Sequence, residues 1–321
     1  MSQRPYFLIV DGHALIYRAY HAFPGLSTPS GMLVNAVYGF TRILLVAIRD
    51  FQPKYLVVTF DHPQPTFRHT DFVDYKANRV EMPDDLKPQI AVVKEVVTAL
   101  NIPQLEVPGY EADDLIGTTA EHLNILRAGT DDGELCELQT IIVTGDRDAF
   151  QLVNEYTHVW MPGRGKGNTD TEYDRDGVKT KMGVYPEQIV DLKALMGDAS
   201  DNIPGVAGVG EKTAVKLMQA FGTLEKLYQR VDELIATGES DEIIRGSLLE
   251  KLKAGRESAI MSQRLAMINR EAPVQVELEA CQVHSYNKAQ ATELLEKLEF
   301  KTLLPLLPAD EFELGIQNAL F

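Results

Sequence analysis

Apolar, strand-like runs that end at acidic residues constrain the fold of this 321-residue chain more than any other feature. Three such runs, at 7–10, 56–60 and 141–145, are each followed at once by aspartate, and a fourth, at 104–107, precedes the sequence GYEADD at 109–114. The carboxyl ends of parallel strands open on one crevice in an α/β sheet, so acids far apart in the sequence should converge there. We therefore predict an α/β fold with a central, mostly parallel sheet and an acidic site at its edge.

Nine carboxylates belong to this candidate site when the later sequence GDASD at 197–201 is included. They are Asp11, Asp61, Glu111, Asp113, Asp114, Asp146, Asp148, Asp198 and Asp201. Two carboxylates about 5 Å apart repel by roughly 3 kcal/mol at an effective dielectric constant of ~20, so the cluster requires cations. Oxygen ligands without cysteine or histidine suit Mg²⁺ or Mn²⁺ and poorly suit Zn²⁺. Any one aspartate could simply cap the helix after its strand, but nine together indicate two or more bound metal ions.

The composition is typical of a protein with about two domains, because 45% of the residues are hydrophobic and can form a sizeable core. The two cysteines, Cys136 and Cys281, lack the spacing of a metal or redox motif, which indicates a reducing compartment. No apolar run approaches ~20 residues, so we expect a cytoplasmic protein without membrane contact. The formal charge of −16 is unusual for a nucleic-acid-binding protein, and bound metal would offset only part of it.

The predicted elements divide the chain into three parts. A β-α-β pattern opens it, and strand signals continue to about residue 174, after which short helices interrupted by glycine and proline follow. We therefore place an α/β core domain at 1–174, a helical domain at 175–308 and a tail at 309–321.

A polar, proline-punctuated segment at 62–85 is too long for an ordinary connection inside a compact domain. Its Arg68, Lys76 and Arg79 are candidate catalytic residues that contact a scissile phosphate, and Tyr75 could stack on an unpaired base. The alternative is a solvated, charged loop. The segment follows Asp61 directly, however, and should therefore pass beside the acidic crevice.

A glycine-rich turn at 201–214 runs into a helix that carries lysines. Glycine lets the backbone approach a ligand closely, and free N–H groups at a helix start can hold a phosphate. The alternative is an ordinary turn between two helices. The candidate DNA contacts of this turn are Gly205, Gly208, Gly210, Lys212 and Lys216.

Seven motifs occur together in one order: VDGH, FD, FR, YKANR, GYEADD, TGDRD and GDASDNIPG. Over residues 5–305 the chain resembles the 5′-3′ exonuclease, or flap endonuclease, family, which includes the nuclease domain of bacterial DNA polymerase I. The resemblance implies a PIN-like core, a helical arch at about 62–85 and a helix-hairpin-helix-type element at about 198–220. It also implies a K⁺ ion held by the carbonyl groups of that element. We expect no polymerase or proofreading domain within these 321 residues.

We accordingly predict a metal-dependent 5′ nuclease that cuts phosphodiester bonds in DNA flaps, nicks and forks during replication or repair. One metal group, assigned to Asp11, Asp61, Glu111 and Asp113, would activate water and hold the scissile phosphate. The second group, assigned to Asp114, Asp146, Asp148, Asp198 and Asp201, would stabilise the departing oxygen. Two alternatives stay open: a PIN-type ribonuclease, which would not need the arch and hairpin element, and a non-catalytic DNA-junction binder, which would not need the acids.

The C-terminal sequence QNALF is similar to the short peptides with which bacterial replication proteins bind the sliding clamp. Leu320 and Phe321 would fill an apolar pocket of the clamp, and Gln317 would bond to its rim. The alternative is that these residues pack on the protein's own core. If the peptide binds the clamp, we expect residue 321 to be a natural end and the protein to be a free-standing monomer.

Overall fold

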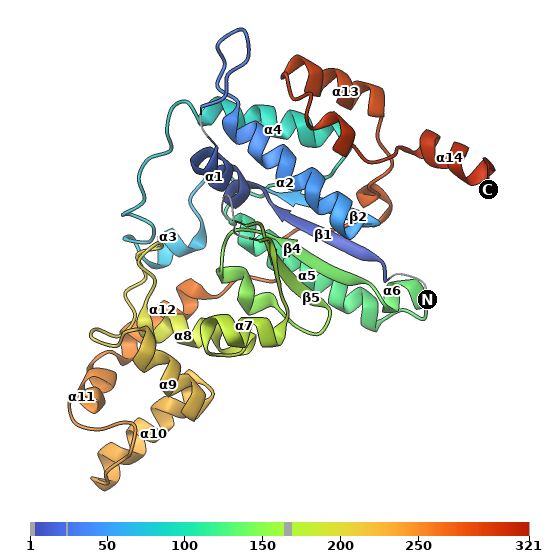
Figure 1. Cartoon of the computed structure of the whole chain (residues 1–321). Helices are drawn as coiled ribbons and strands as arrows, with labels where there is room; N and C mark the ends of the chain where they lie inside the picture. The colour runs from blue at the N-terminus through green and yellow to red at the C-terminus, as the bar shows by residue number, and fades with distance from the viewer. Residues whose placement is uncertain (1–3, 24, 164–168, 321) are drawn as a thin grey trace.

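The computed structural model describes residues 4–23, 25–163 and 169–320, and its centre is one six-stranded sheet (Figure 1). The strand order is β3-β2-β1-β4-β5-β6. The strands are β1 (Tyr6–Asp11), β2 (Tyr55–Thr59), β3 (Gln104–Leu105), β4 (Gln139–Val143), β5 (Thr157–Met161) and β6 (Thr171–Tyr173). All neighbouring pairs are parallel except β5 and β6, which are antiparallel. The mostly parallel sheet is confirmed.

Helices cover both faces of the sheet, so its central strands are buried on both sides and consist almost wholly of apolar residues. Leu8 and Val10 of β1 face the layer formed by α1 (Gly12–Ala22), α2 (Asn35–Phe51) and α4 (Lys87–Ala99). Phe7 and Ile9 alternate to the other face, against α5 (Ala112–Ala128). A short helix, α6 (Gly133–Cys136), leads into β4.

The segment at 62–85, which we call the arch segment, differs from the helical arch that the resemblance implies. Only α3 (Phe67–Asp71) is helical within it, and the rest consists of turns and irregular backbone. Its prolines lack the N–H group that a helix needs, and Lys76 has a positive φ of 55°, which no right-handed helix contains.

The helical part contains α7 (Arg175–Met182), α8 (Ile189–Met196), α9 (Glu211–Phe221), α10 (Leu224–Thr237), α11 (Ser247–Ala254) and α12 (Arg256–Ala266). In Figure 1 α9, α10 and α11 extend away from the sheet, whereas α8 and α12 lie nearer to it. Residues 197–210 join α8 to α9 and form what we call the hairpin loop. Gly205 of this loop has a φ of 64°, and a Cβ atom there would lie 2.2 Å from the Gly197 nitrogen, so only glycine fits.

The chain returns to the sheet after the helical part. Helix α13 (Lys288–Lys297) places Ala291 and Leu295 in the same apolar core as α2 and α4, although the sequence assigned these residues to the helical domain. The last described helix is α14 (Glu311–Leu320). Within the described ranges, 3₁₀ helices lie at Asp148–Leu152, Pro186–Gln188, Glu279–Cys281 and Leu304–Leu306. Among the helices of the described residues, none is both long and apolar enough to span a bilayer.

Candidate active site

Hydrogen bonds tie together the acids that follow different strands. Asp11 ends β1, and its carboxylate accepts bonds from the Ala14 amide at 3.0 Å and from the Thr144 hydroxyl beyond β4 at 2.7 Å. Asp61, after β2, accepts a 2.8 Å bond from the Ala112 amide at the start of α5. One of these bonds joins the end of β1 to the residue after β4, and another joins the residue after β2 to the start of α5. Because β1 lies between β2 and β4 in the sheet, these acids lie at the same edge.

Burial and mutual repulsion raise the pKa values of the central carboxylates. The pKa values of Asp11 and Asp148 are raised to about 7, mainly by burial and in part by the negative charge of nearby Asp146. Burial, together with the charges of Asp146 and Asp11, also raises the pKa of Asp113 well above its usual value. The site thus carries more negative charge than its own surroundings stabilise.

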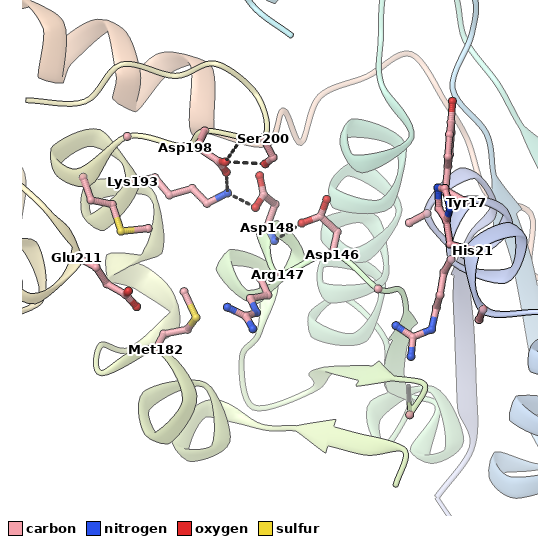
Figure 2. A pocket seen from close by; sticks show the side chains of 18 residues that line it. Tyr17, His21, Asp146, Arg147, Asp148, Met182, Lys193, Asp198, Ser200 and Glu211 are labelled. Atoms are coloured by element: carbon pink, nitrogen blue, oxygen red, sulfur yellow. Dashed lines mark hydrogen bonds and ion pairs between the residues drawn. The ribbon is translucent and has the colours of Figure 1, made fainter. Parts of the chain in front are cut away.

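Lys193 of α8 is a member of the site that sequence reasoning missed. The residue is 4% exposed, and its ammonium group donates to Asp148 and, at 2.6 Å, to Asp198 (Figure 2). Burial opposes the charge of this ammonium group, but the two carboxylates raise its pKa above the ordinary value. Burial also opposes ionisation of Asp198, yet Lys193 and Ser200 lower the pKa of that carboxyl to about 2. The sequence signal was a lysine within the otherwise apolar end of α8, five positions before Asp198.

The arch segment lies against the other side of the acidic cluster. Lys76 Nζ is 2.9 Å from Glu111 Oε2, and Arg79 Nη2 is 2.6 Å from Asp201 Oδ1. The Tyr75 hydroxyl donates towards both carboxylates, at 3.1 and 3.2 Å. Tyr75 is only 3% exposed, so the prediction that its ring stacks on a base is wrong for this conformation. The two cations, by contrast, lie beside the acids as predicted.

Arg68 and Asp114 form a buried ion pair with each other. They are 2% and 0% exposed, and two hydrogen bonds of 2.9 and 2.7 Å join the guanidinium to the carboxylate. Arg68 also donates to the carbonyl groups of Leu265 and Met267, while Asp114 accepts from the amides of Glu111 and Asn269. This geometry disagrees with two predictions, that Asp114 binds a metal ion and that Arg68 contacts the scissile phosphate. The polar atoms of both side chains are already bonded inside the protein.

The remaining eight carboxylates suit a hard divalent cation. They offer only oxygen ligands, and the raised pKa values of Asp11, Asp113 and Asp148 show an excess of negative charge that a cation would neutralise. Within the described part of the chain, no three His, Cys, Asp or Glu side chains are already gathered around one point. Lys76, Arg79 and Lys193 instead pair with several of the acids.

A pocket of about 880 Å³ lies beside the cluster, between α1 on one side and α7, α8 and α9 on the other (Figure 2). Asp146, Asp148 and Asp198 line it, together with Tyr17 and Arg147. It therefore opens directly onto the carboxylates that follow β4 and α8.

The hairpin loop presents some of its predicted DNA contacts to solvent. Gly208, Gly210, Lys212 and Lys216 are exposed, and Gly210 caps the N-terminus of α9. Gly205 is buried against Gly197, so its predicted contact with DNA is not available in this structure.

The predicted clamp peptide lies largely outside the described residues. The backbone of Gln317 and Leu320 belongs to α14, their side chains are not described, and Phe321 lies wholly outside the described ranges.

Comparisons with known proteins identify the family. Residues 6–183 match the family described as 5′-3′ exonuclease, N-terminal resolvase-like domain, and residues 184–289 match the 5′-3′ exonuclease, C-terminal SAM fold. DNA polymerase I of Bacillus subtilis (strain 168) is 40% identical over 314 residues, which cover 98% of this chain and 33% of that protein. The chain thus spans about a third of the length of this relative.

Two solved structures share the fold. The T5 D15 protein co-crystallised with metal ions has a TM-score of 0.63 at 18% identity, over 91% of this chain and 99% of that one. The catalytic core of Rad2 in complex with DNA substrate has a TM-score of 0.56 at 18% identity, over 94% of this chain and 93% of that one. With both family matches and an edge of the sheet lined by acids, this chain belongs to the 5′-3′ exonuclease family.

Proposed function

We propose that this protein hydrolyses phosphodiester bonds in DNA as a divalent-metal-dependent 5′-3′ exonuclease and flap endonuclease. The observation that carries the proposal is the convergence of acids from β1, β2, β4, α5 and the hairpin loop at one edge of the sheet, with pKa values raised by burial and repulsion. The family matches over residues 6–289 support it.

Two Mg²⁺ or Mn²⁺ ions would occupy the carboxylate cluster, and when bound they would lower the pKa of an attacking water and offset charge on the cleaved phosphate. Asp11, Asp61, Glu111 and Asp113 would hold one ion. Asp146, Asp148, Asp198 and Asp201 would hold the other. We reassign Asp114 to the internal ion pair with Arg68, because both of its oxygens are already bonded there.

Lys76 and Arg79 would change partners during catalysis. They now neutralise Glu111 and Asp201, and once those carboxylates bind metal, the two cations would be released to contact the scissile phosphate. An ammonium or guanidinium group aimed at a phosphate stabilises the charge that develops in the transition state. The arch segment would therefore act on the DNA only when the carboxylates are occupied.

The hairpin loop would hold the duplex beside the cut. The backbone N–H groups of Gly208 and Gly210 lie at an exposed helix N-terminus, where a phosphate is favoured, and Lys212 and Lys216 add positive charge. A K⁺ ion at the loop carbonyls would join the protein to the same phosphates.

Cleavage of a 5′-flap DNA and of a single-stranded RNA, each with Mg²⁺, tests the function. We expect the flap to be cut and the RNA to be left intact. Asp146→Asn or Asp61→Asn should abolish cleavage and leave flap binding within a few-fold, because each removes a metal ligand and no phosphate contact. Preferential RNA cleavage would favour the PIN-type ribonuclease, binding without cleavage would favour a junction-binding module, and full turnover in either variant would contradict the metal assignment.

We further propose that the C-terminal peptide binds the sliding clamp through Gln317, Leu320 and Phe321, with the protein acting as a monomer. The support is the sequence pattern of residues 317–321 alone. Deletion of residues 317–321 should leave cleavage of a short flap unchanged and abolish stimulation by the clamp. Equal clamp binding with and without the peptide would contradict this proposal.

A further inference from the structure

Arg147 stands between two acids of the site, yet it pairs with neither. Its side chain is exposed, and within the described residues it makes no ion pair and no hydrogen bond. The contrast with Lys193 is informative, because that cation is buried and bonded to Asp148 and Asp198. Asp146 and Asp148 flank Arg147 in the sequence, but the Arg147 guanidinium forms no ion pair with either of them within the described residues.

The direction of the side chain explains why it is unpaired. In Figure 2 the guanidinium of Arg147 points away from the carboxylates of Asp146 and Asp148 and towards Met182 of α7. Arg147 lines the pocket of about 880 Å³ that runs from the acids towards the hairpin loop. The loop after β4 thus presents carboxylates on one side and a free cation on the other.

We propose that Arg147 binds a backbone phosphate of the DNA between the cut and the duplex held by the hairpin loop. A guanidinium presents a planar set of donors that matches a phosphate with two parallel hydrogen bonds. Asp198, which is less exposed than Arg147, and Glu211 also line the pocket. Both would repel a phosphate beside them, so the contact would lie at the exposed Arg147 head. This inference rests on the proposed function, since it requires DNA to cross the pocket.

The ligand chemistry is that of a phosphodiester and not of a base. Arg147 would therefore strengthen binding to any sequence and would place the cut relative to the duplex. It differs in role from Lys76 and Arg79, which lie on the opposite side of the cluster beside Glu111 and Asp201.

The first test measures how flap-DNA binding depends on salt, in chelator so that no cleavage occurs. Each neutralised phosphate of a duplex contributes about −0.9 to the slope of log K against log salt concentration. Arg147→Ala should reduce the magnitude of the slope by about one such contribution and weaken binding roughly 3- to 10-fold near 0.1 M salt. Arg147→Lys, which keeps the charge, should restore most of the slope.

Arg42 provides the matched control. It is another exposed arginine without an ion pair or hydrogen bond in the described chain, and it lies on α2 and not among the pocket residues. Arg42→Ala should leave both the slope and the affinity unchanged. An equal loss in both variants would overturn the proposal, because it would reflect net charge alone.

The second test locates the contact. Flap substrates with a single neutral methylphosphonate, moved one position at a time through the duplex next to the cut, are cleaved with Mg²⁺ under single-turnover conditions. At one position the substitution should slow the wild type but have little added effect in Arg147→Ala, because the same contact is already lost. Additive losses at every position would overturn the inference.

The two tests separate this inference from the proposed function. If the wild type cleaves the flap and Arg147→Ala matches it in slope and rate, only the role of Arg147 is overturned. If the wild type does not cleave any flap, the proposed function fails, and the salt dependence of binding still decides whether Arg147 contacts phosphate.

Discussion

Replacing Asp114 by asparagine separates a structural carboxylate from the metal-binding ones. The change keeps the shape of the side chain but removes its charge, and it leaves the buried Arg68 guanidinium without its main partner. Removing one partner of a buried ion pair costs about 3–5 kcal/mol. Glu111 lies 3.6 Å from Arg68 and would neutralise part of the charge, so we expect a loss of about 3 kcal/mol in the free energy of unfolding.

Urea unfolding in chelator measures this loss without any contribution from bound metal. The chain has one tryptophan, Trp160, which is 5% exposed in β5, so its fluorescence reports loss of the core that contains the sheet. With a urea dependence of about 2–3 kcal/mol per M, the midpoint should fall by about 1–1.5 M. Arg68→Met should also be destabilising, and the double variant should lose about 1–3 kcal/mol less than the sum of the two.

Asp146→Asn is the matched control, because it also removes one aspartate charge from the same end of the sheet. Asp146 raises the pKa values of Asp11, Asp113 and Asp148 by repulsion, so its neutralisation should not destabilise the metal-free protein. If Asp114→Asn unfolds at the wild-type urea concentration and only loses cleavage, the ion-pair reasoning is refuted and Asp114 is a metal ligand after all.

Three other predictions concern the lysine of the arch segment, the hairpin loop and the effect of pH. Lys76→Ala should slow single-turnover cleavage by about 10²-fold or more, since it removes charge stabilisation of the transition state. An unchanged rate would indicate that Lys76 belongs to a solvated, charged loop and does not contact the phosphate. Gly210→Val should fold normally, because a Cβ atom at this position meets nothing within 4 Å. The variant should bind a flap more weakly and a bare single strand almost as well as before, and equal weakening of both would contradict the duplex contact. In chelator, the free energy of unfolding should fall as pH rises from about 4 to 7. The pKa values of Asp11 and Asp148 are raised to about 7 in the folded protein, so over this pH interval the folded protein binds more protons than the unfolded chain. Saturating Mg²⁺ should weaken or reverse this trend, and a metal-free stability that rises over the same interval would contradict it.

Local pattern was sufficient to predict the sheet and the place of the acids. Apolar runs such as 7–10 and 141–143 are long enough to be strands and too uniformly apolar to be exposed on either face, which indicates a parallel sheet covered by helices. The acids follow these runs directly, and the direction of parallel strands then brings them to one edge.

Contacts between distant segments decided what the local pattern could not. The arch segment was predicted to be helical from its resemblance to the family, but its prolines and the positive φ of Lys76 leave only α3 helical. The return of α13 to the sheet and the burial of Lys193 depend on packing between segments that lie far apart in the sequence.

The sequence by itself determined that acids gather at one edge of a parallel sheet, because strand direction and the order of residues require it. Only the tertiary structure decided the role of each acid, because the pKa and the bonding partners of a carboxylate depend on its burial and on the charges that long-range packing places beside it. Asp113 and Asp114 show this best: they are adjacent in α5, yet Asp113 is left with repelling neighbours, whereas Asp114 is bonded on both oxygens to Arg68, a residue 46 positions away.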